Sequence, residues 1–153
     1  MGKLYKKEIL QLIESSDELK ASYLLKSESN LASAKILLQN NKLEESVGLA
    51  YYSMYHSVTA LLFKAGIKCE NHAAAIILLK KLFDIDNTEI SFAKSERVDK
   101  QYYVDFHITR EEVAQVINVS EKFNKHLLDF ISRISQKDII ECRARLRKLI
   151  GIE

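Results

Sequence analysis

The feature that most restricts the fold of this chain is its shortage of residues that interrupt helices: proline is absent, and glycine occurs only four times in 153 residues. Proline and glycine commonly end helices or form the tight turns between β-strands, so their scarcity favours long helices. Hydrophobic residues make up 47% and charged residues 29% of the sequence, close to the usual globular mixture. A chain of this length normally forms one core, so we expect a single domain over residues 1–153.

Apolar and small residues recur at intervals of three and four positions along most of the chain, as on the buried face of a helix. The pattern predicts helices over about residues 17–40, 43–65, 71–83, 109–134 and 138–150, and a short amphipathic helix over 4–13. Residues 90–106 are less periodic and are predicted to form a loop and one short helix. No alternation typical of strands is found. The predicted fold is an all-α antiparallel up-down bundle of four to five helices, with its core over about 17–134 and a basic C-terminal helix over about 138–150.

Capping signals predict where several of these helices begin or end. Ser15-Ser16-Asp17 and Asn71 offer side chains that can accept the first free amides of a helix. Residues 109–112 and 135–138 fit the capping box, in which a hydroxyl and an acidic side chain three residues later each bind the other's backbone amide. Gly66 can adopt the left-handed conformation that ends a helix.

The charge balance does not favour binding of a polyanion by the whole surface, because 23 Lys and Arg are balanced by 21 Asp and Glu. Positive residues outnumber negative ones in the segment 133–153, which we interpret as the solvated face of a helix. Any surface that binds nucleic acid must therefore be local.

The sequence does not contain the motifs that are typical of several classes of protein. Cys69 and Cys142 have no CxxC spacing and no signal-peptide pattern occurs near Met1, so we expect a cytoplasmic protein. The longest apolar stretch, residues 73–79, is far shorter than the roughly 20 residues that span a bilayer, so no membrane association is expected. No metal-ligand spacing, Gly-rich phosphate loop or GxSxG turn is present, and neither a metal nor a cofactor is expected.

One histidine has a setting that suggests chemistry. His56 follows Tyr52 by four positions in a predicted helix and lies beside Tyr55, so an imidazole and a phenol share one helix face. Such a pair can bind a base or a phosphate, or position a proton. The alternative is a hydrogen-bonded histidine at the edge of the core.

The segment Ala50-Tyr51-Tyr52-Ser53-Met54-Tyr55-His56, followed by Ala60-Leu61-Leu62 and Gly66, resembles the "AYYAMFHAARALL…G" helix of small stand-alone HEPN proteins. Asn71-His72 is similar to that family's histidine at the start of the next helix. Residues 97–102, Arg-Val-Asp-Lys-Gln-Tyr, resemble its "RxxADY" element, and the helix over 109–131 matches its last long helix. The resemblance spans about residues 19–134.

This resemblance implies a four- or five-helix bundle that forms a homodimer, and for many members a metal-independent ribonuclease. It also implies a partner for some members, a minimal nucleotidyltransferase in a toxin–antitoxin or defence system. By the same resemblance, His56 is the candidate catalytic residue. The candidate residues for binding nucleotide or RNA are Tyr52, Tyr55, His56, His72, Arg97 and Tyr102.

The sequence departs from the family's catalytic pattern, an Arg-x4-6-His motif, because the positions seven to five before His56 are Leu49, Ala50 and Tyr51. A guanidinium would hold the scissile phosphate and stabilise the charge that develops on it, which leucine cannot do. Lys64, Arg97 or the basic C-terminal helix could supply a substitute cation.

Three hypotheses follow. The first is a HEPN-like domain with weak or no catalysis that binds a nucleotide, an RNA or a protein partner around Tyr52, His56 and Arg97. The second is a metal-independent endoribonuclease in which His56 transfers a proton and another cation replaces the arginine. The third is a helical oligomerisation module without a nucleotide site.

Overall fold

A computed structural model describes the backbone of residues 1–102 and 107–152, and the side chains of residues 1–97 and 107–152. In chain order, the described elements are α1 (Gly2–Lys6), β1 (Leu10–Leu12), α2 (Asp17–Gln39), α3 (Leu43–Lys64), β2 (Ile67–Cys69), α4 (His72–Phe83), α5 (Thr88–Tyr102), α6 (Arg110–Arg133) and α7 (Gln136–Ile150). The predicted all-α class is confirmed.

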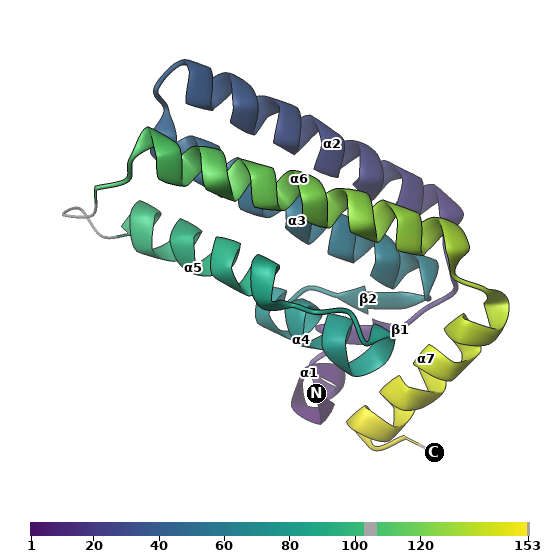
Figure 1. Cartoon of the computed structure of the whole chain (residues 1–153). Coiled ribbons are helices and arrows are strands. Elements are labelled where there is room, and N and C mark those ends of the chain that lie inside the picture. The colour runs from purple at the N-terminus through teal and green to yellow at the C-terminus, as the bar shows by residue number, and fades with distance from the viewer. Residues whose placement is uncertain (103–106, 153) are drawn as a thin grey trace.

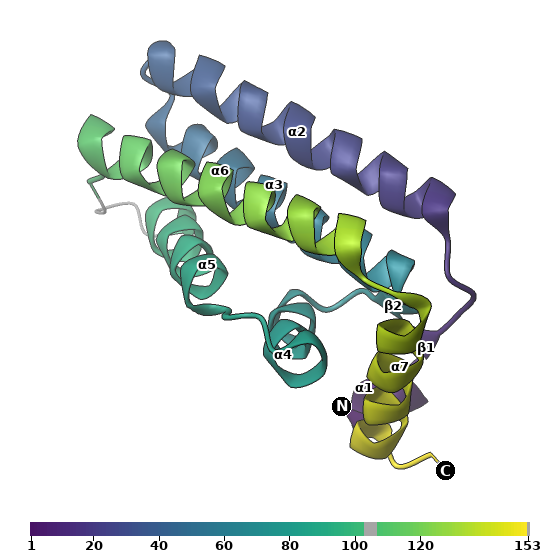
Figure 2. The same cartoon turned by 45° about the vertical axis from the view of Figure 1, so that its right-hand side comes forward.

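Four of the described helices form an antiparallel bundle. Figure 1 shows α2, α3 and α6 side by side, with α5 on the side of the bundle away from α2, and the chain direction alternates from α2 to α3, α5 and α6. Helices α1 and α7 and the two strands gather at the end of the bundle where α2 begins and α6 ends, and α4 lies between them and the start of α5 (Figure 2).

Helix α3 is the centre of this arrangement. It packs against α2, α5, α6, α4 and β2, and 15 of its 22 residues are buried. A helix can be buried on nearly all sides only when the side chains on every face are apolar or small. Helix α3 meets this condition, because it consists largely of alanine, serine, glycine and large apolar residues. Side chains that do carry polar groups on α3 must therefore find partners within the fold.

A buried polar network joins α2, α3 and α6. The Ser27 hydroxyl lies 2.7 Å from both the backbone oxygen of Ser53 and the hydroxyl of Ser57. Ser57 donates to the Asn124 side-chain oxygen at 3.0 Å, and the amide of Asn124 donates to the Ser53 hydroxyl at 3.0 Å. Because these groups satisfy one another away from water, the network fixes the rotation of the three helices relative to one another.

The prediction for residues 4–13 is wrong. This segment forms the short helix α1, a turn at Glu8 with φ of 59°, and then β1, which pairs antiparallel with β2, Leu10 opposite Cys69. Leu10 and Ile67 are fully buried, so the two strands close over the core after α3 ends. The pairing, rather than the local apolar pattern, decides the structure here, and the expectation of a chain without strands also fails at this point.

The prediction for residues 90–106 underestimated the helix in this segment. Helix α5 spans 15 residues, and its side chains Ile90 and Ala93 are fully buried. Among the described side chains of α5 these two form a narrow buried stripe and most of the others are polar or charged, which is why the periodicity is weak. Residues 103–106 lie outside the described part of the chain.

The predicted caps are confirmed. Ser16 accepts from the amide of Leu19 and Asn71 from that of Ala74, and both capping boxes form, at Thr109–Glu112 and Ser135–Asp138. Helix α7 therefore begins at Gln136, two residues earlier than expected.

Gly66 follows α3 with the predicted left-handed φ, 70°. The side chain of Arg143 reaches this turn from α7, and its Nη1 donates to the backbone oxygens of Ile13 and Gly66, both at 2.7 Å, and of Ala65 at 3.2 Å. A Cβ at Gly66 would lie 2.1 Å from that nitrogen. The basic helix α7 is thus more than a solvated face, because one of its arginines joins α3 and the N-terminal segment.

Candidate functional site

Four aromatic side chains of α3 lie next to one another because they follow the helical repeat. Tyr51 and Tyr55 are one turn apart, as are Tyr52 and His56. Tyr51 is fully buried, whereas Tyr52 and His56 are partly exposed. The helix therefore presents two rings inward and two toward its surface.

Helix α5 brings Arg97 over these rings. Its guanidinium carbon lies 4.7 Å from the centre of the Tyr52 ring and 5.5 Å from that of Tyr51. A guanidinium over a phenol ring is held by the charge distribution of the ring, with an energy of about 0.5 to 2 kcal/mol. This contact places a fixed positive charge beside His72 and Tyr52.

Helix α4 contributes His72, its first residue. The His72 ring stacks on that of Tyr55 with 3.7 Å between centroids, and its Nδ1 lies 2.8 Å from the Tyr51 hydroxyl. Desolvation lowers the pKa of His72, and the positive charges of Arg97 and Lys94 lower it further. Burial raises the pKa of Tyr51, so its phenol stays protonated at neutral pH.

Helix α2 contributes the residues that contact His56 on its other side. The amide Nδ2 of Asn30 lies 3.0 Å from His56 Nδ1, and the Tyr23 ring is 5.7 Å from the imidazole, centroid to centroid. Desolvation lowers the pKa of His56, and the charges of Lys26 and His72 add to the effect. At neutral pH the imidazole is therefore uncharged.

The contact with Asn30 also selects the tautomer of His56. An amide nitrogen can only donate, so Nδ1 accepts, and the single hydrogen of the neutral ring lies on Nε2. His56 thus offers an N–H donor at Nε2, while the lone pair that a general base needs is occupied by Asn30.

The structure brings together five of the six residues proposed to bind nucleotide or RNA. Together with Tyr51 they form what we call the His56–Arg97 cluster: Tyr51, Tyr52, Tyr55, His56, His72 and Arg97. The sixth, Tyr102, has its side chain outside the described residues. Binding by these residues stays a prediction.

The sequence analysis missed three residues of α2 near His56, namely Tyr23, Lys26 and Asn30. They are spaced at i, i+3 and i+7 and so share one helix face, next to the predicted buried stripe. The available signal was this spacing, but it does not tell which part of α3 the face meets. The sequence analysis also missed Lys94, which lies one turn before Arg97 on α5.

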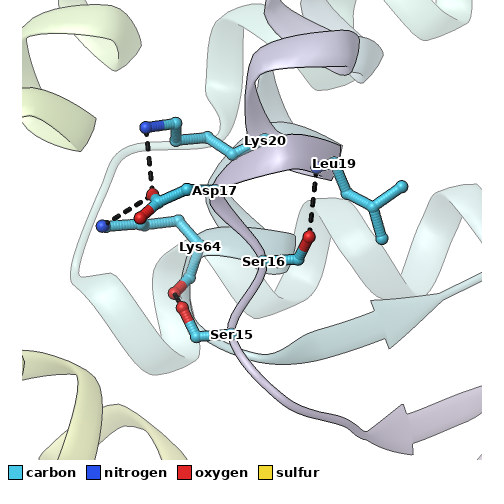
Figure 3. Close-up of polar contacts among 6 residues, drawn as sticks. All are labelled: Ser15, Ser16, Asp17, Leu19, Lys20 and Lys64. Atoms are coloured by element: carbon cyan, nitrogen blue, oxygen red, sulfur yellow. Dashed lines mark hydrogen bonds and ion pairs between the residues drawn. The ribbon is translucent and has the colours of Figure 1, made fainter.

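The cations that were expected to substitute for the missing arginine have different surroundings. Lys64 forms an ion pair with Asp17 at 2.9 Å, and Asp17 also pairs with Lys20 at 3.1 Å (Figure 3). This contact ties the end of α3 to the start of α2, where Ser15 donates to the Lys64 backbone oxygen. Leu49 itself packs against the core.

On α7, Arg143 binds backbone oxygens, as described above, and Arg145 donates to the backbone oxygen of Leu82 at 3.2 Å. Both arginine side chains therefore bind backbone oxygens of residues that are distant in the sequence. Arg97 is therefore the candidate cation that lies within the cluster.

Within the described residues, no group of three or more His, Cys, Asp or Glu side chains is arranged to hold a metal ion. The same part of the chain has no helix whose length and apolar character would allow it to cross a membrane.

Comparison with known proteins supports a single family. The model of the HEPN domain family matches residues 21–148. UPF0332 protein PH1297 of Pyrococcus horikoshii is 29% identical over 109 residues, which cover 71% of each chain. A protein of Methanocaldococcus jannaschii named "Putative toxin MJ0605" is 28% identical over 130 residues, covering 80% of this chain and 88% of the relative.

Proposed function

The chain belongs to the HEPN domain family, and we propose that it is an RNA-binding member with weak or no catalytic activity, which binds single-stranded RNA through the His56–Arg97 cluster. The observation that carries this proposal is the position of Arg97 over Tyr52, 4.7 Å from the ring centre. Single-stranded RNA is commonly bound by aromatic rings and guanidinium planes on which bases stack, and by cations that contact phosphates. Arg97 and Tyr52 are partly exposed and combine both features.

The two histidines add uncharged hydrogen-bonding groups to this surface. His56, with its hydrogen on Nε2, can donate to a phosphate oxygen or to a base edge. His72 is oriented by Tyr51 and Tyr55, so its ring is held in place before any ligand arrives. Preorganised side chains lose less freedom on binding, which favours affinity.

The same geometry argues for weak or no catalysis. Proton abstraction by His56 needs a free lone pair, but its Nδ1 is paired with Asn30. Helix α3 contains no arginine, and Leu49 stands where the family resemblance leads us to expect one. The proposal therefore separates the binding of RNA, which the cluster supports, from its cleavage.

Binding is tested by fluorescence anisotropy with a 5′-labelled single-stranded octauridylate in the presence of a chelator. Arg97→Ala and Tyr52→Ala should each weaken binding by about 5- to 150-fold, the range expected from the loss of about 1 to 3 kcal/mol per stacked base. Arg147→Ala is the matched control, because it removes the same charge from the exposed side of α7. Equal affinity in the wild type and in Arg97→Ala would overturn the proposal.

A second candidate function is a metal-independent endoribonuclease. It is favoured by one observation, a neutral His56 with the positive charge of Lys26 nearby, since an uncharged imidazole and a cation are two of the groups that RNA cleavage requires. The test incubates labelled RNA with protein and chelator. Cleavage by the wild type that is lost in His56→Ala would establish this function and refute the absence of catalysis.

The cellular role that we propose follows the relatives. One of them carries the name "Putative toxin MJ0605", and we infer that this chain acts in a toxin–antitoxin or defence setting, as a homodimer and with a nucleotidyltransferase as the candidate protein partner. Light scattering of the purified protein tests the dimer. A cluster that binds no RNA, but binds a nucleotidyltransferase in a manner that Arg97→Ala weakens, would favour the protein partner over the nucleic acid.

A further inference from the structure

A groove runs between α4 and α5, directly beside the His56–Arg97 cluster. Its volume is about 440 Å³, within the range of about 300 to 1,000 Å³ usual for ligand sites. We call it the α4–α5 groove; it is lined by Ala73, Ile76 and Ile77 from α4 and by Asn87, Ser91 and Lys94 from α5 and the turn before it.

The groove is continuous with the cluster on both of its walls. On α4, Ala73 directly follows His72. On α5, Lys94 lies one turn before Arg97, so their side chains project from the same face of the helix. Lys94 is also close enough to His72 for its charge to act on that ring.

The two walls of the groove differ in their chemistry. The α4 wall is apolar and partly accessible: Ile77 is 45% exposed and Ala73 is also exposed, whereas Ile76 is buried. The opposite wall carries the Ser91 hydroxyl and the side chain of Asn87, whose Nδ2 donates to the Ile76 backbone oxygen at 3.0 Å, and Lys94 stands at the side nearest the cluster. An apolar wall opposite a few polar groups suits a flat, heteroaromatic base, and a lysine beside an arginine suits a phosphodiester.

We propose that the α4–α5 groove is a second nucleotide subsite, which takes the base of the nucleotide adjacent to the one bound at the cluster, while Lys94 and Arg97 bind the phosphodiester that links the two. This inference rests on the proposed function and makes it more specific. The minimal ligand is then a dinucleotide of single-stranded RNA rather than a mononucleotide. A base-paired strand could not insert a base between the two helices, so duplex RNA should bind weakly.

The test compares uridine monophosphate with the 5′-phosphorylated dinucleotide pUpU as competitors of labelled octauridylate. In the wild type, pUpU should bind at least about 5-fold more tightly than the monophosphate, since a second stacked base adds about 1 to 3 kcal/mol. Two variants probe the subsite: Ser91→Phe fills the groove and keeps the charge, and Lys94→Ala removes the cation and keeps the groove. Both should reduce the affinity for pUpU to near that for the monophosphate.

Matched controls are Ser132→Phe on the exposed side of α6 and Lys81→Ala at the other end of α4, and neither should change either affinity. Melting curves show that each variant folds, and Lys94→Ala decides the question if Ser91→Phe does not fold.

The second subsite is overturned if the wild type binds the monophosphate and pUpU with equal affinity. It is also overturned if Lys94→Ala binds pUpU as tightly as the wild type does. Both conclusions hold even when Arg97→Ala weakens the binding of all ligands. Failure of the wild type to bind any of the three ligands overturns the proposed function itself, and the subsite with it.

Discussion

Replacing Asn30 with aspartate changes the chemistry of His56 without changing the shape of its neighbour. In the wild type, the Asn30 amide donates to Nδ1 at 3.0 Å, and desolvation together with nearby positive charge keeps the pKa of His56 below its ordinary value. A carboxylate at the same place can only accept. It therefore requires the hydrogen on Nδ1 and favours the charged ring.

The magnitude follows from the distance. Two unit charges 3.0 Å apart attract by about 5 kcal/mol at an effective dielectric constant of about 20. Removing part of the carboxylate's hydration offsets a share of this energy, because Asn30 is partly buried. A remaining 1.4 kcal/mol corresponds to a rise of about one pH unit in the titration midpoint of His56, so we expect an increase of about one unit or more.

The assay is an NMR titration of the histidine rings, in which ¹⁵N shifts also report the tautomer. In Asn30→Asp, the hydrogen of the neutral His56 ring should move from Nε2 to Nδ1, and the midpoint should rise. Asn118→Asp, which adds the same charge on the exposed side of α6, should change neither. A wild-type His56 with its hydrogen on Nδ1, or an unchanged midpoint in Asn30→Asp, would refute the reasoning.

Three further predictions concern stability. Gly66→Ala should lower the free energy of unfolding by about 2 to 4 kcal/mol in urea titrations, because its φ is 70° and the new Cβ would meet Arg143. Gly151 has a φ of 76° and nothing within 4 Å of a new Cβ, so Gly151→Ala should cost only the conformational part, about 1 to 2 kcal/mol. Equal losses of stability in the two variants would contradict this account. Asn124→Ala should cost about 1 to 3 kcal/mol, since it removes two hydrogen bonds of the network, each worth about 0.5 to 1.5 kcal/mol, and an unchanged urea midpoint would count against the network. The pKa values of His56 and His72 are lowered in the folded state, so the unfolded state binds protons first as the pH decreases. The melting temperature should therefore fall below about pH 6.5. A melting temperature that stays constant between pH 7.5 and 5.5 would show that neither ring is desolvated.

The bundle could be predicted from sequence because helices depend on local signals. The buried stripe of α6 and the capping boxes at Thr109 and Ser135 each lie within a few residues, and the structure has them where the sequence places them. Strand β1 could not be predicted in this way, since its partner lies 55 to 59 residues later in the chain. The contact of Arg143 with Ile13 spans an even longer separation and depends on how α7 docks.

The candidate site shows the same division. The pair Tyr52 and His56 follows from spacing on one helix, and His72 and Arg97 came from the resemblance to a family. Asn30 and Lys26 could not be found, because their proximity to His56 depends on the rotation of α2 against α3, which the buried network of Ser27 sets. The tautomer of His56 depends on this long-range contact and therefore appears only in three dimensions.

The most direct test of the central claim is an NMR titration of the wild-type protein with unlabelled octauridylate in chelator, with the RNA recovered afterwards. The account predicts that ring signals of His56 and His72 shift together and saturate, that His126, exposed on α6, does not shift, and that the RNA remains intact. Shifts confined to His126, no shift at all, or recovered RNA that is cleaved in the wild type but intact with His56→Ala would contradict it.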